Sequence, residues 1–379
     1  MQTFIIKPIH NANLEKELEI IGYDKSYRHK MIEKFKYKTL KIYDLSLAQA
    51  NILKQTALAT GADCAVNKNV ITGNIEKSDV ILGGSFSQLQ KIADKLSLQP
   101  FSLSKLSTDI KSELIEKTTQ TKIMGILNIT DNSFSDGGEY NSTEKACEHF
   151  KQLVEDGADI IDIGAESTKP YTEGVNAKTQ LEKILPVLDY AKNFDIPISI
   201  DTRSSVVADE CLKNGANIIN DVSGLKYDNE MATTLAKYPN STLILQHSLG
   251  KEINMSEHHS YTNITDDVFK DLYHQIEYAK FNGIENIIID VGIGFDKTRD
   301  ENFEILRRIE EFYSLGYPVM TGISRKSTLG LQNADNQEKD IYTLALNTLA
   351  VSQKVDYLRV HNVKIHKQML KIMKDWTTK

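Results

Sequence analysis

The sequence predicts a (β/α)8 TIM barrel that follows a small α/β N-terminal domain, and three observations lead to this fold class. From residue 122 onward, short apolar stretches alternate with longer segments of helical periodicity, which is typical of parallel strands joined by helices. One short pattern of residues recurs within this region. The chain has 379 residues, more than the ~250 that such a barrel needs, which leaves room for a second domain.

The barrel region, residues 119–379, contains eight apolar stretches that we expect to form its strands. They are residues 122–128, 159–164, 197–201, 217–221, 242–247, 286–290, 318–323 and 356–360. The pattern Gly157–Asp162 recurs as Gly215–Asn220 and more loosely as Gly283–Asp290. In each copy a glycine ends a helix, and a strand rich in β-branched residues follows it.

Residues 1–118 predict a smaller domain in which helices and strands are mixed. The expected strands are residues 39–45 and 78–82, and the expected helices are residues 14–21, 47–59 and 88–96. Residues 102–119 are polar with spaced Leu and Ile, which predicts a helical linker. No motif in this region carries a chemical role. Two interpretations stay open: a docking module, or a domain that packs against the barrel or stabilises a dimer.

Composition and charge exclude several classes of protein. The chain is 40% hydrophobic and 26% charged, as is usual for a globular protein, and its net charge of -7 argues against nucleic acid as the main partner. We expect no signal peptide and no membrane span. The chain has three cysteines and no C-x-x-C pair, so neither a zinc site nor a disulfide framework is indicated: Cys64, Cys147 and Cys211. Scattered cysteines of this kind fit a reducing compartment, so we expect a cytoplasmic location.

Polar residues end or follow all eight expected strands. In chain order they include Asn128, Asp162, Asp201, Asn220, His247, Asp290, Lys326 and Arg359. The C-terminal ends of barrel strands carry catalysis, whereas the opposite ends carry stability. One polar terminal residue means little, but eight together predict a site. Two alternatives stay open, since Asp162 can be a buried structural acid and Asp221 can be a helix cap.

The types of these residues indicate the chemistry of a ligand. Asp201, Asn220 and Asp290 are short acceptors and amides that suit a flat heterocycle with several N–H donors. Lys326 and Arg359 belong to the last two strands, where barrels commonly hold phosphate. Together they predict a ring that carries a phosphate or pyrophosphate group.

These residues and their order resemble the dihydropteroate synthase family of folate biosynthesis. The matching segments are Met124–Thr130, Ser133–Gly138, Asp159–Gly164, Glu166–Pro170, Ile198–Thr202, Ile218–Gly224, Gly292–Phe295, Ser324–Ser327 and Arg359–His361. The resemblance covers the whole barrel region. Residues 1–118 resemble extensions that some members of the family carry.

The resemblance implies a transferase that condenses (7,8-dihydropterin-6-yl)methyl diphosphate with 4-aminobenzoate and releases pyrophosphate. It implies that the pterin is held by Asp201, Asn220, Asp290 and Lys326, with Asp201 and Lys326 as the catalytic residues. It further implies Mg²⁺, a homodimer and competition by sulfonamides, with small molecules as the substrates and no membrane partner.

The other implied contacts are distributed over the rim of the barrel. Arg359, His361, Thr168 and Lys169 would hold the pyrophosphate, and Asn128 would bind its Mg²⁺. Phe295, Ser327, Thr168 and Pro170 would shape the 4-aminobenzoate pocket. Asp136 would lie in the first loop, which closes over the site.

Two departures from the family pattern lie in loops. Residues 130–134 read Thr-Asp-Asn-Ser-Phe, where the family usually has Thr-Pro-Asp-Ser-Phe. Lys169 stands where the family usually has arginine, and lysine cannot make a bidentate phosphate contact. The residues implied for the pterin and the anion are present. The departures therefore concern loop closure and turnover rate more than binding.

Two other functions compete with this interpretation. A pterin-dependent methyltransferase that acts from methyltetrahydrofolate on a corrinoid protein shares the barrel, but it does not need Arg359 and His361. A non-catalytic pterin-binding protein would account for the loop departures. We read His258, His259 and Tyr261 as a solvated loop and not as metal ligands, because no third ligand lies near them in sequence.

Overall fold

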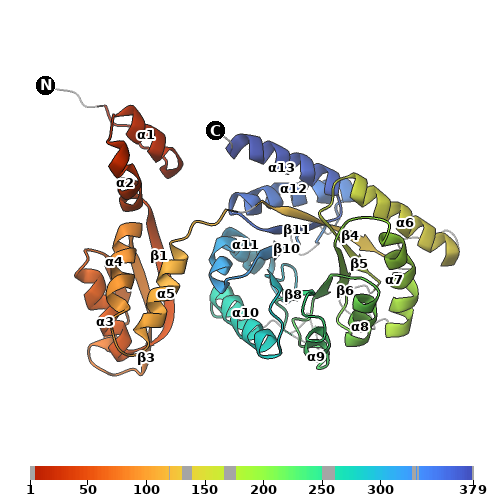
Figure 1. The fold of residues 1–379 in the computed structure, drawn as a ribbon, viewed down its shortest axis with the longest axis horizontal. Coiled ribbons are helices and arrows are strands. Elements are labelled where there is room, and N and C mark those ends of the chain that lie inside the picture. Colours follow the sequence, from red (N-terminus) through yellow and green to blue (C-terminus); the bar gives the residue numbers. More distant parts are fainter. Residues whose placement is uncertain are drawn as a thin grey trace. The chain divides into compact units, whose positions relative to one another are not determined.

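The computed structural model describes residues 5–118, 120–129, 139–165, 176–249, 261–326, 330 and 333–377. The chain divides into two compact units, Met1–Lys117 and Thr118–Lys379 (Figure 1). The sequence had placed this division one residue later. No helix in the described ranges has the length and apolar character needed to cross a membrane.

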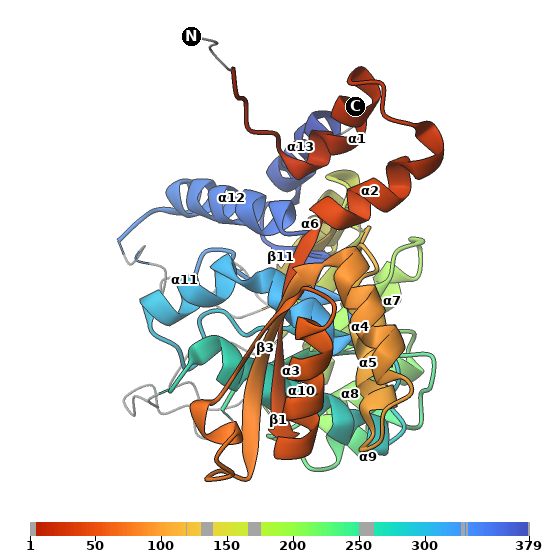
Figure 2. The ribbon, with the colours of Figure 1, turned by 90° about the vertical axis from the view of Figure 1, so that its left-hand side faces the viewer.

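The N-terminal unit is a three-stranded antiparallel sheet with helices. Its sheet has the order β1-β3-β2, with β1 at Tyr37–Ser46, β2 at Asp63–Val66 and β3 at Lys77–Ser85. The long strands β1 and β3 run side by side (Figure 2). The helices are α1 Leu14–Ile20, α2 Arg28–Phe35, α3 Leu47–Leu58, α4 Phe86–Leu96 and α5 Leu103–Glu113, with 3-10 turns η1 Asn11–Asn13, η2 Lys25–Tyr27 and η3 Lys68–Val70.

Two serines make the transition from strand to helix in this unit. Ser46 ends β1 and Ser85 ends β3, and each accepts a hydrogen bond from the third residue of the next helix in a capping box. The strand predicted at residues 78–82 therefore continues through Gly84 before α4 begins. Leu103 and Ile110 are buried in the core of this unit, so α5 is part of the domain and not only a linker.

The second unit is a closed barrel of parallel strands, as predicted, with the order β10-β11-β4-β5-β6-β7-β8-β9. The strands are β4 Lys122–Asn128, β5 Ile160–Gly164, β6 Ile198–Asp201, β7 Ile218–Asp221, β8 Thr242–Gln246, β9 Ile287–Asp290, β10 Val319–Thr321 and β11 Tyr357–Val360. All lie within two residues of the predicted bounds. The helices are α6 Glu139–Glu155, α7 Ala177–Ala191, α8 Ser205–Lys213, α9 Met231–Leu235, α10 Ile264–Phe281, α11 Arg299–Arg307, η4 Ile309–Leu315, α12 Asn336–Ser352 and α13 Val363–Thr377.

The interior of the barrel contains an apolar layer that is separate from the core between strands and helices. It consists of Met124, Ile160, Ile218, Ile244, Ile288 and Met320, which come from six different strands and contact one another. Side chains alternate along a strand, so the residue two positions later points to the same side. Asp162, Asn220 and Asp290 therefore also point into the barrel, one layer nearer the C-terminal strand ends.

We predict that Phe150→Ala lowers the free energy of unfolding by about 3–5 kcal/mol, because it leaves a cavity in the core. Phe150 is fully buried and packs on the rings of Tyr190 and Phe194. Phe281, which is 90% exposed, provides the matched control, and Phe281→Ala should change stability by less than about 0.5 kcal/mol. Urea unfolding of the three proteins measures this, and equal stabilities would contradict it.

Candidate active site

A polar layer lies directly above the apolar layer of the barrel. Asp162, Asn220 and Asp290 follow apolar interior residues by two positions on β5, β7 and β9. Asp201 ends β6, and Arg359 follows Tyr357, which packs on the apolar layer from β11. The side chains of the other four residues are all buried: Asp162, Asn220, Asp290 and Asp201. The period of two along the strands thus brings acids, an amide and a guanidinium together at one end of the barrel.

Arg359 joins two of these carboxylates. Its Nε donates to Asp162 Oδ2 and its Nη2 donates to Asp201 Oδ2, both at 2.6 Å. Asn220 Nδ2 also donates to Asp162 Oδ2, at 3.1 Å. Burial opposes the charge of Arg359, but Asp162 and Asp201 outweigh it and raise the pKa of the guanidinium above its usual value. The sequence had suggested separate acidic and cationic halves, and the structure connects them through Arg359.

Several buried polar atoms of this layer have no hydrogen-bond partner among the described residues. They include the second carboxylate oxygen of Asp162, Oδ1, and the amide oxygen of Asn220. The remaining nitrogen of Arg359, Nη1, also makes no hydrogen bond within the described ranges. A buried unpaired polar atom costs about 1–3 kcal/mol, so such atoms in one layer are typical of a ligand site. Asp162 Oδ1 and Asn220 Oδ1 are acceptors and would suit a ligand that donates, whereas Arg359 Nη1 is a donor and would suit one that accepts.

Asp290, at the end of β9, and Lys326, after β10, lie next to the loop 292–295. Asp290 Oδ1 accepts the backbone N–H of Gly292 at 2.8 Å, and Lys326 Nζ donates to the carbonyl of Ile293. Burial raises the pKa of Asp290, and Lys326 acts against this change. Burial lowers the pKa of Lys326 to about 8, with Asp290 acting against it. The ammonium group of Lys326 also lies 4.5 Å from the centroid of the Phe295 ring.

Lys297, which is not among the residues predicted from the sequence, holds the same loop. Its Nζ contacts His247 Nδ1 at 2.9 Å and donates to the carbonyls of Gly292 and Phe295, both at 3.0 Å. One signal was available: Lys297 directly precedes Thr298, the N-cap of α11, where the helix dipole disfavours a cation. A lysine at that position indicates a role outside the helix.

The structure decides the interpretation of two further residues, Asp221 and Tyr261. The oxygens of Asp221 accept hydrogen bonds from Ser223 and Leu225 in the loop that follows it, so this acid shapes its own loop. His258, His259 and Tyr261 were read as a solvated loop. His258 and His259 lie outside the residues that the structure describes, and for Tyr261 the interpretation is wrong. Tyr261 is only partly exposed, its hydroxyl is buried, and its ring lies 6.5 Å from that of His247.

The remaining predicted residues are at the rim or outside the described ranges. Asn128 ends β4 with an exposed side chain, and His361 follows β11 with its Nδ1 at 2.9 Å from Ser324 Oγ. Thr168, Lys169, Pro170, Asp136 and Ser327 lie outside the residues that the structure describes.

We predict that Gly292→Ala destabilises the protein by about 1–3 kcal/mol more than Gly283→Ala. Both glycines have positive φ, +69° and +86°, so both substitutions strain the backbone. A Cβ at Gly292 would also overlap the carbonyl oxygen of His247, whereas nothing lies within 4 Å of one at Gly283. Thermal unfolding of the two variants tests this, and equal losses would show that the loop yields freely.

Comparisons with known proteins agree with this architecture. The family described as "Pterin binding enzyme" matches residues 124–361. A dihydropteroate synthase of Clostridium beijerinckii is 41% identical over 249 residues, which are 64% of this chain and 90% of that protein. A probable bifunctional folylpolyglutamate synthase/dihydropteroate synthase of Halobacterium salinarum is 35% identical over 83% of this chain. That match is longer than the barrel unit, so it includes part of the N-terminal unit.

The chain spans only 40% of the length of this bifunctional relative. Among solved structures, the dihydropteroate synthase of Clostridium difficile with pteroic acid superposes with a TM-score of 0.64 at 36% identity. It covers 70% of this chain and 100% of its own. The family match spans more than half of the chain and includes every polar strand end described above. The chain therefore belongs to the family of pterin binding enzymes, together with the dihydropteroate synthases.

Proposed function

We propose that the protein is a dihydropteroate synthase, which condenses (7,8-dihydropterin-6-yl)methyl diphosphate with 4-aminobenzoate and releases pyrophosphate. The observation that carries this proposal is the buried polar layer, in which unpaired acceptors and a partly unpaired guanidinium lie within one barrel mouth. A dihydropteroate synthase solved with pteroic acid shares the barrel fold and is 36% identical in sequence over the 70% of this chain that it covers.

The pterin ring would bind to the acidic and amide side chains. A pterin is flat and presents several ring and amino N–H donors. The unpaired oxygen of Asn220 and the carboxylates of Asp201 and Asp290 are the acceptors that such donors need. Lys326 would donate to a ring acceptor from the side of Asp290. Because these groups are buried, each bond forms with little competition from water.

The pyrophosphate group would bind at the cationic side of the same rim. Arg359 Nη1 and His361 would donate to it from β11 and from the residue that follows this strand, and Thr168 and Lys169 would add contacts from the second loop. A guanidinium held by two carboxylates is already oriented, so little side-chain entropy is lost on binding.

We further propose that Asn128 binds Mg²⁺ that accompanies the pyrophosphate. In the described ranges no group of three or more His, Cys, Asp or Glu side chains could hold a metal ion. Mg²⁺ would be bound through the Asn128 oxygen, phosphate oxygens and water, the arrangement that this ion commonly adopts with phosphates. The ion would neutralise charge on the leaving group.

The proposed reaction needs no strong general base. The bond between the pterin methylene carbon and the diphosphate oxygen breaks, and its electron pair leaves with pyrophosphate. Asp201, which lies against Arg359, would stabilise the positive charge that remains on the pterin. The neutral nitrogen of 4-aminobenzoate then attacks the methylene carbon and loses a proton to solvent. Phe295, Ser327 and Thr168 would orient this second substrate, and the loop that contains Asp136 would exclude water.

The decisive experiment is an assay of pyrophosphate release by the purified protein with Mg²⁺, pterin diphosphate and 4-aminobenzoate. Release that depends on both substrates and is competitively inhibited by sulfonamides is the expected result. No release from folded protein would reject the proposal. Methyl transfer from methyltetrahydrofolate to a corrinoid protein would favour a methyltransferase, and binding of pterin diphosphate without turnover would favour a non-catalytic pterin-binding protein.

We predict that Lys326→Ala lowers kcat/KM for pterin diphosphate by at least ~100-fold, because it removes a buried, charge-assisted contact. The matched control is Lys280→Ala on the exposed side of α10, whose side chain is 50% exposed. Steady-state pyrophosphate release measures both variants. The assigned role would be disproved if Lys326→Ala kept near-normal activity, as the control is expected to do.

We also propose a homodimer in the cytoplasm. The three cysteines are free, which suits a reducing compartment.

The proposed dimer interface lies on helices α12 and α13. These helices pack against each other and carry exposed apolar side chains, Ile341 and Leu349 on α12 and Ile372 and Trp376 on α13. Exposed apolar patches of this kind mark protein interfaces, and a twofold axis would bury the same patch on both copies.

We predict that Leu349→Asp converts the dimer to a monomer, because a charge would be buried against an apolar surface. Phe281 on α10 is also exposed, so Phe281→Asp is the control and should remain dimeric. Sedimentation analysis gives the mass of each species. A monomeric unmodified chain, or dissociation by both variants alike, would refute the assignment to α12 and α13.

A further inference from the structure

Ser324 and His361 contact each other across neighbouring strand ends. Ser324 follows β10 and His361 follows β11, and these strands pair in parallel. Ser324 Oγ lies 2.9 Å from His361 Nδ1, and the backbone N–H of His361 donates to the same oxygen at 3.2 Å. Ser324 is only 6% exposed, so water competes little for either bond.

These two contacts favour one direction for the hydroxyl proton of Ser324. A backbone N–H can only donate, so it occupies a lone pair of Ser324 Oγ. In the described part of the chain, His361 Nδ1 is the acceptor that the hydroxyl proton can reach. A neutral imidazole has one protonated and one bare nitrogen. If Nδ1 accepts, it is the bare nitrogen, and Nε2 carries the proton.

The surroundings of His361 keep its ring neutral. Burial, Arg325 and Arg359 lower the pKa of His361 to about 3, and His149 acts in the same direction. The carboxylate of Asp340 raises the pKa of His361 but offsets only part of this decrease. The ring therefore acts near neutral pH through an N–H bond and not through a positive charge.

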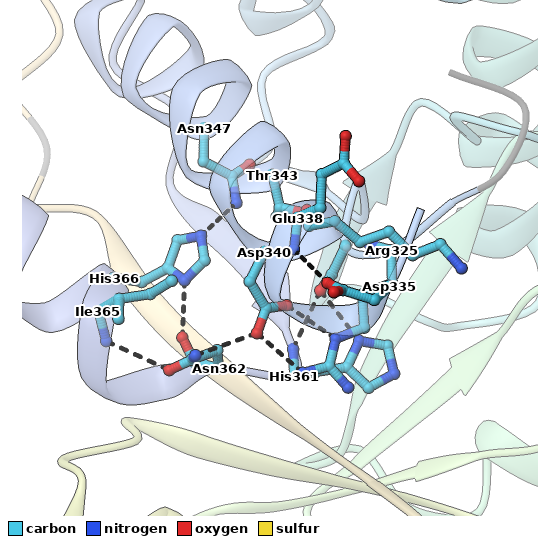
Figure 3. A network of polar contacts seen from close by, with 12 residues as sticks. Arg325, Asp335, Glu338, Asp340, Thr343, Asn347, His361, Asn362, Ile365 and His366 are labelled. Carbon is cyan, nitrogen blue, oxygen red and sulfur yellow. Dashed lines mark hydrogen bonds and ion pairs between the residues drawn. The ribbon is translucent and has the colours of Figure 1, made fainter. Parts of the chain in front are cut away.

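Helix α12 contacts Arg325 and Asn362, the residues that follow the two partners in the chain (Figure 3). Arg325, directly after Ser324, has a φ of 59°, a left-handed conformation that other contacts must stabilise. Its guanidinium donates to both carboxylate oxygens of Asp340, at 2.7 and 2.9 Å. Asn362, directly after His361, donates to Asp340 Oδ2 at 3.1 Å. One carboxylate of α12 thus anchors the residues that follow both Ser324 and His361.

The other ring nitrogen of His361 is available to a ligand. His361 Nε2 has no hydrogen-bond partner within the described ranges, and Arg359 lies two residues earlier, on β11. We propose that Ser324 is a positioning residue that fixes His361 as a neutral Nε2–H donor to an oxygen of the pyrophosphate group. This inference rests on the proposed function and assigns a role to the serine that the reaction itself does not use.

The test is nitrogen NMR of the full chain labelled with ¹⁵N-histidine, because the shift of each ring nitrogen reports whether it carries a proton. The chain has nine histidines, and His361→Gln identifies the signals of His361 by their loss. We expect a single Nε2–H tautomer between about pH 6 and 8. Ser324→Ala should give a mixture of tautomers or the Nδ1–H form, and Ser324→Thr, which keeps a hydroxyl, should restore Nε2–H.

Binding of inorganic pyrophosphate with Mg²⁺, measured by calorimetry, supplies the second measurement. Ser324→Ala should weaken it about tenfold, which corresponds to about 1.4 kcal/mol, and Ser324→Thr should recover most of it. Ser248→Ala is the matched control, since Ser248 is equally buried but its hydroxyl donates to the Ser223 carbonyl, away from His361. It should change neither the tautomer nor the affinity.

Two results would overturn the proposal: an Nδ1–H tautomer in the unmodified chain, or an unchanged Nε2–H tautomer in Ser324→Ala. A failure of the proposed function looks different. The unmodified chain would then show the Nε2–H tautomer and its loss in Ser324→Ala, but it would neither bind nor release pyrophosphate. In that case pyrophosphate would not be the ligand of His361, although Ser324 would still fix the tautomer of the ring.

Discussion

The ion pairs of Arg359 with Asp162 and Asp201 are the interaction on which the barrel mouth depends. A buried guanidinium or carboxylate is costly alone, so none of the three tolerates the loss of a partner. In the closed sheet, β4 and β5 lie between β11 and β6, so Arg359 spans several strands to reach Asp201. Its bonds therefore fix the relative positions of strand ends that no single hydrogen-bonded ladder connects. They also orient Asp162 Oδ1 and Arg359 Nη1 toward the space that a ligand would enter.

This arrangement places both signs of charge close together. Asp162 and Asp201 share Arg359. Burial raises the pKa of Asp290 and lowers that of Lys326, and each of these two groups opposes the change in the other. A substrate that carries an anionic leaving group and becomes positive when it departs needs both kinds of group within one site. Since the side chains are already oriented by their mutual bonds, little reorganisation is required as the charge changes.

The sequence predicted the barrel well because its determinants are local. Each strand is a short apolar run bounded by polar residues, and the alternation within it places Asp162, Asn220 and Asp290 on the inner face. The roles that it missed depend on contacts between distant residues. Lys297 reaches His247, fifty positions away in the chain, and nothing near either residue specifies the other. The short strand β2 and the burial of α5 were missed for the same reason, since tertiary packing and not periodicity decides them.

Helix α12 shows why such contacts matter for function. Its inner face bears Asp340, Thr343 and Asn347, which are buried and spaced as one side of a helix. Asp340 fixes the backbone beside both Ser324 and His361, so the geometry at the cationic rim depends on the position of this helix. Its outer face bears the exposed Ile341 and Leu349. Because Asp340 and Ile341 are adjacent, a partner bound to the outer face would restrain the same turn that holds the rim, and assembly would stiffen the anion site without contributing a residue to it.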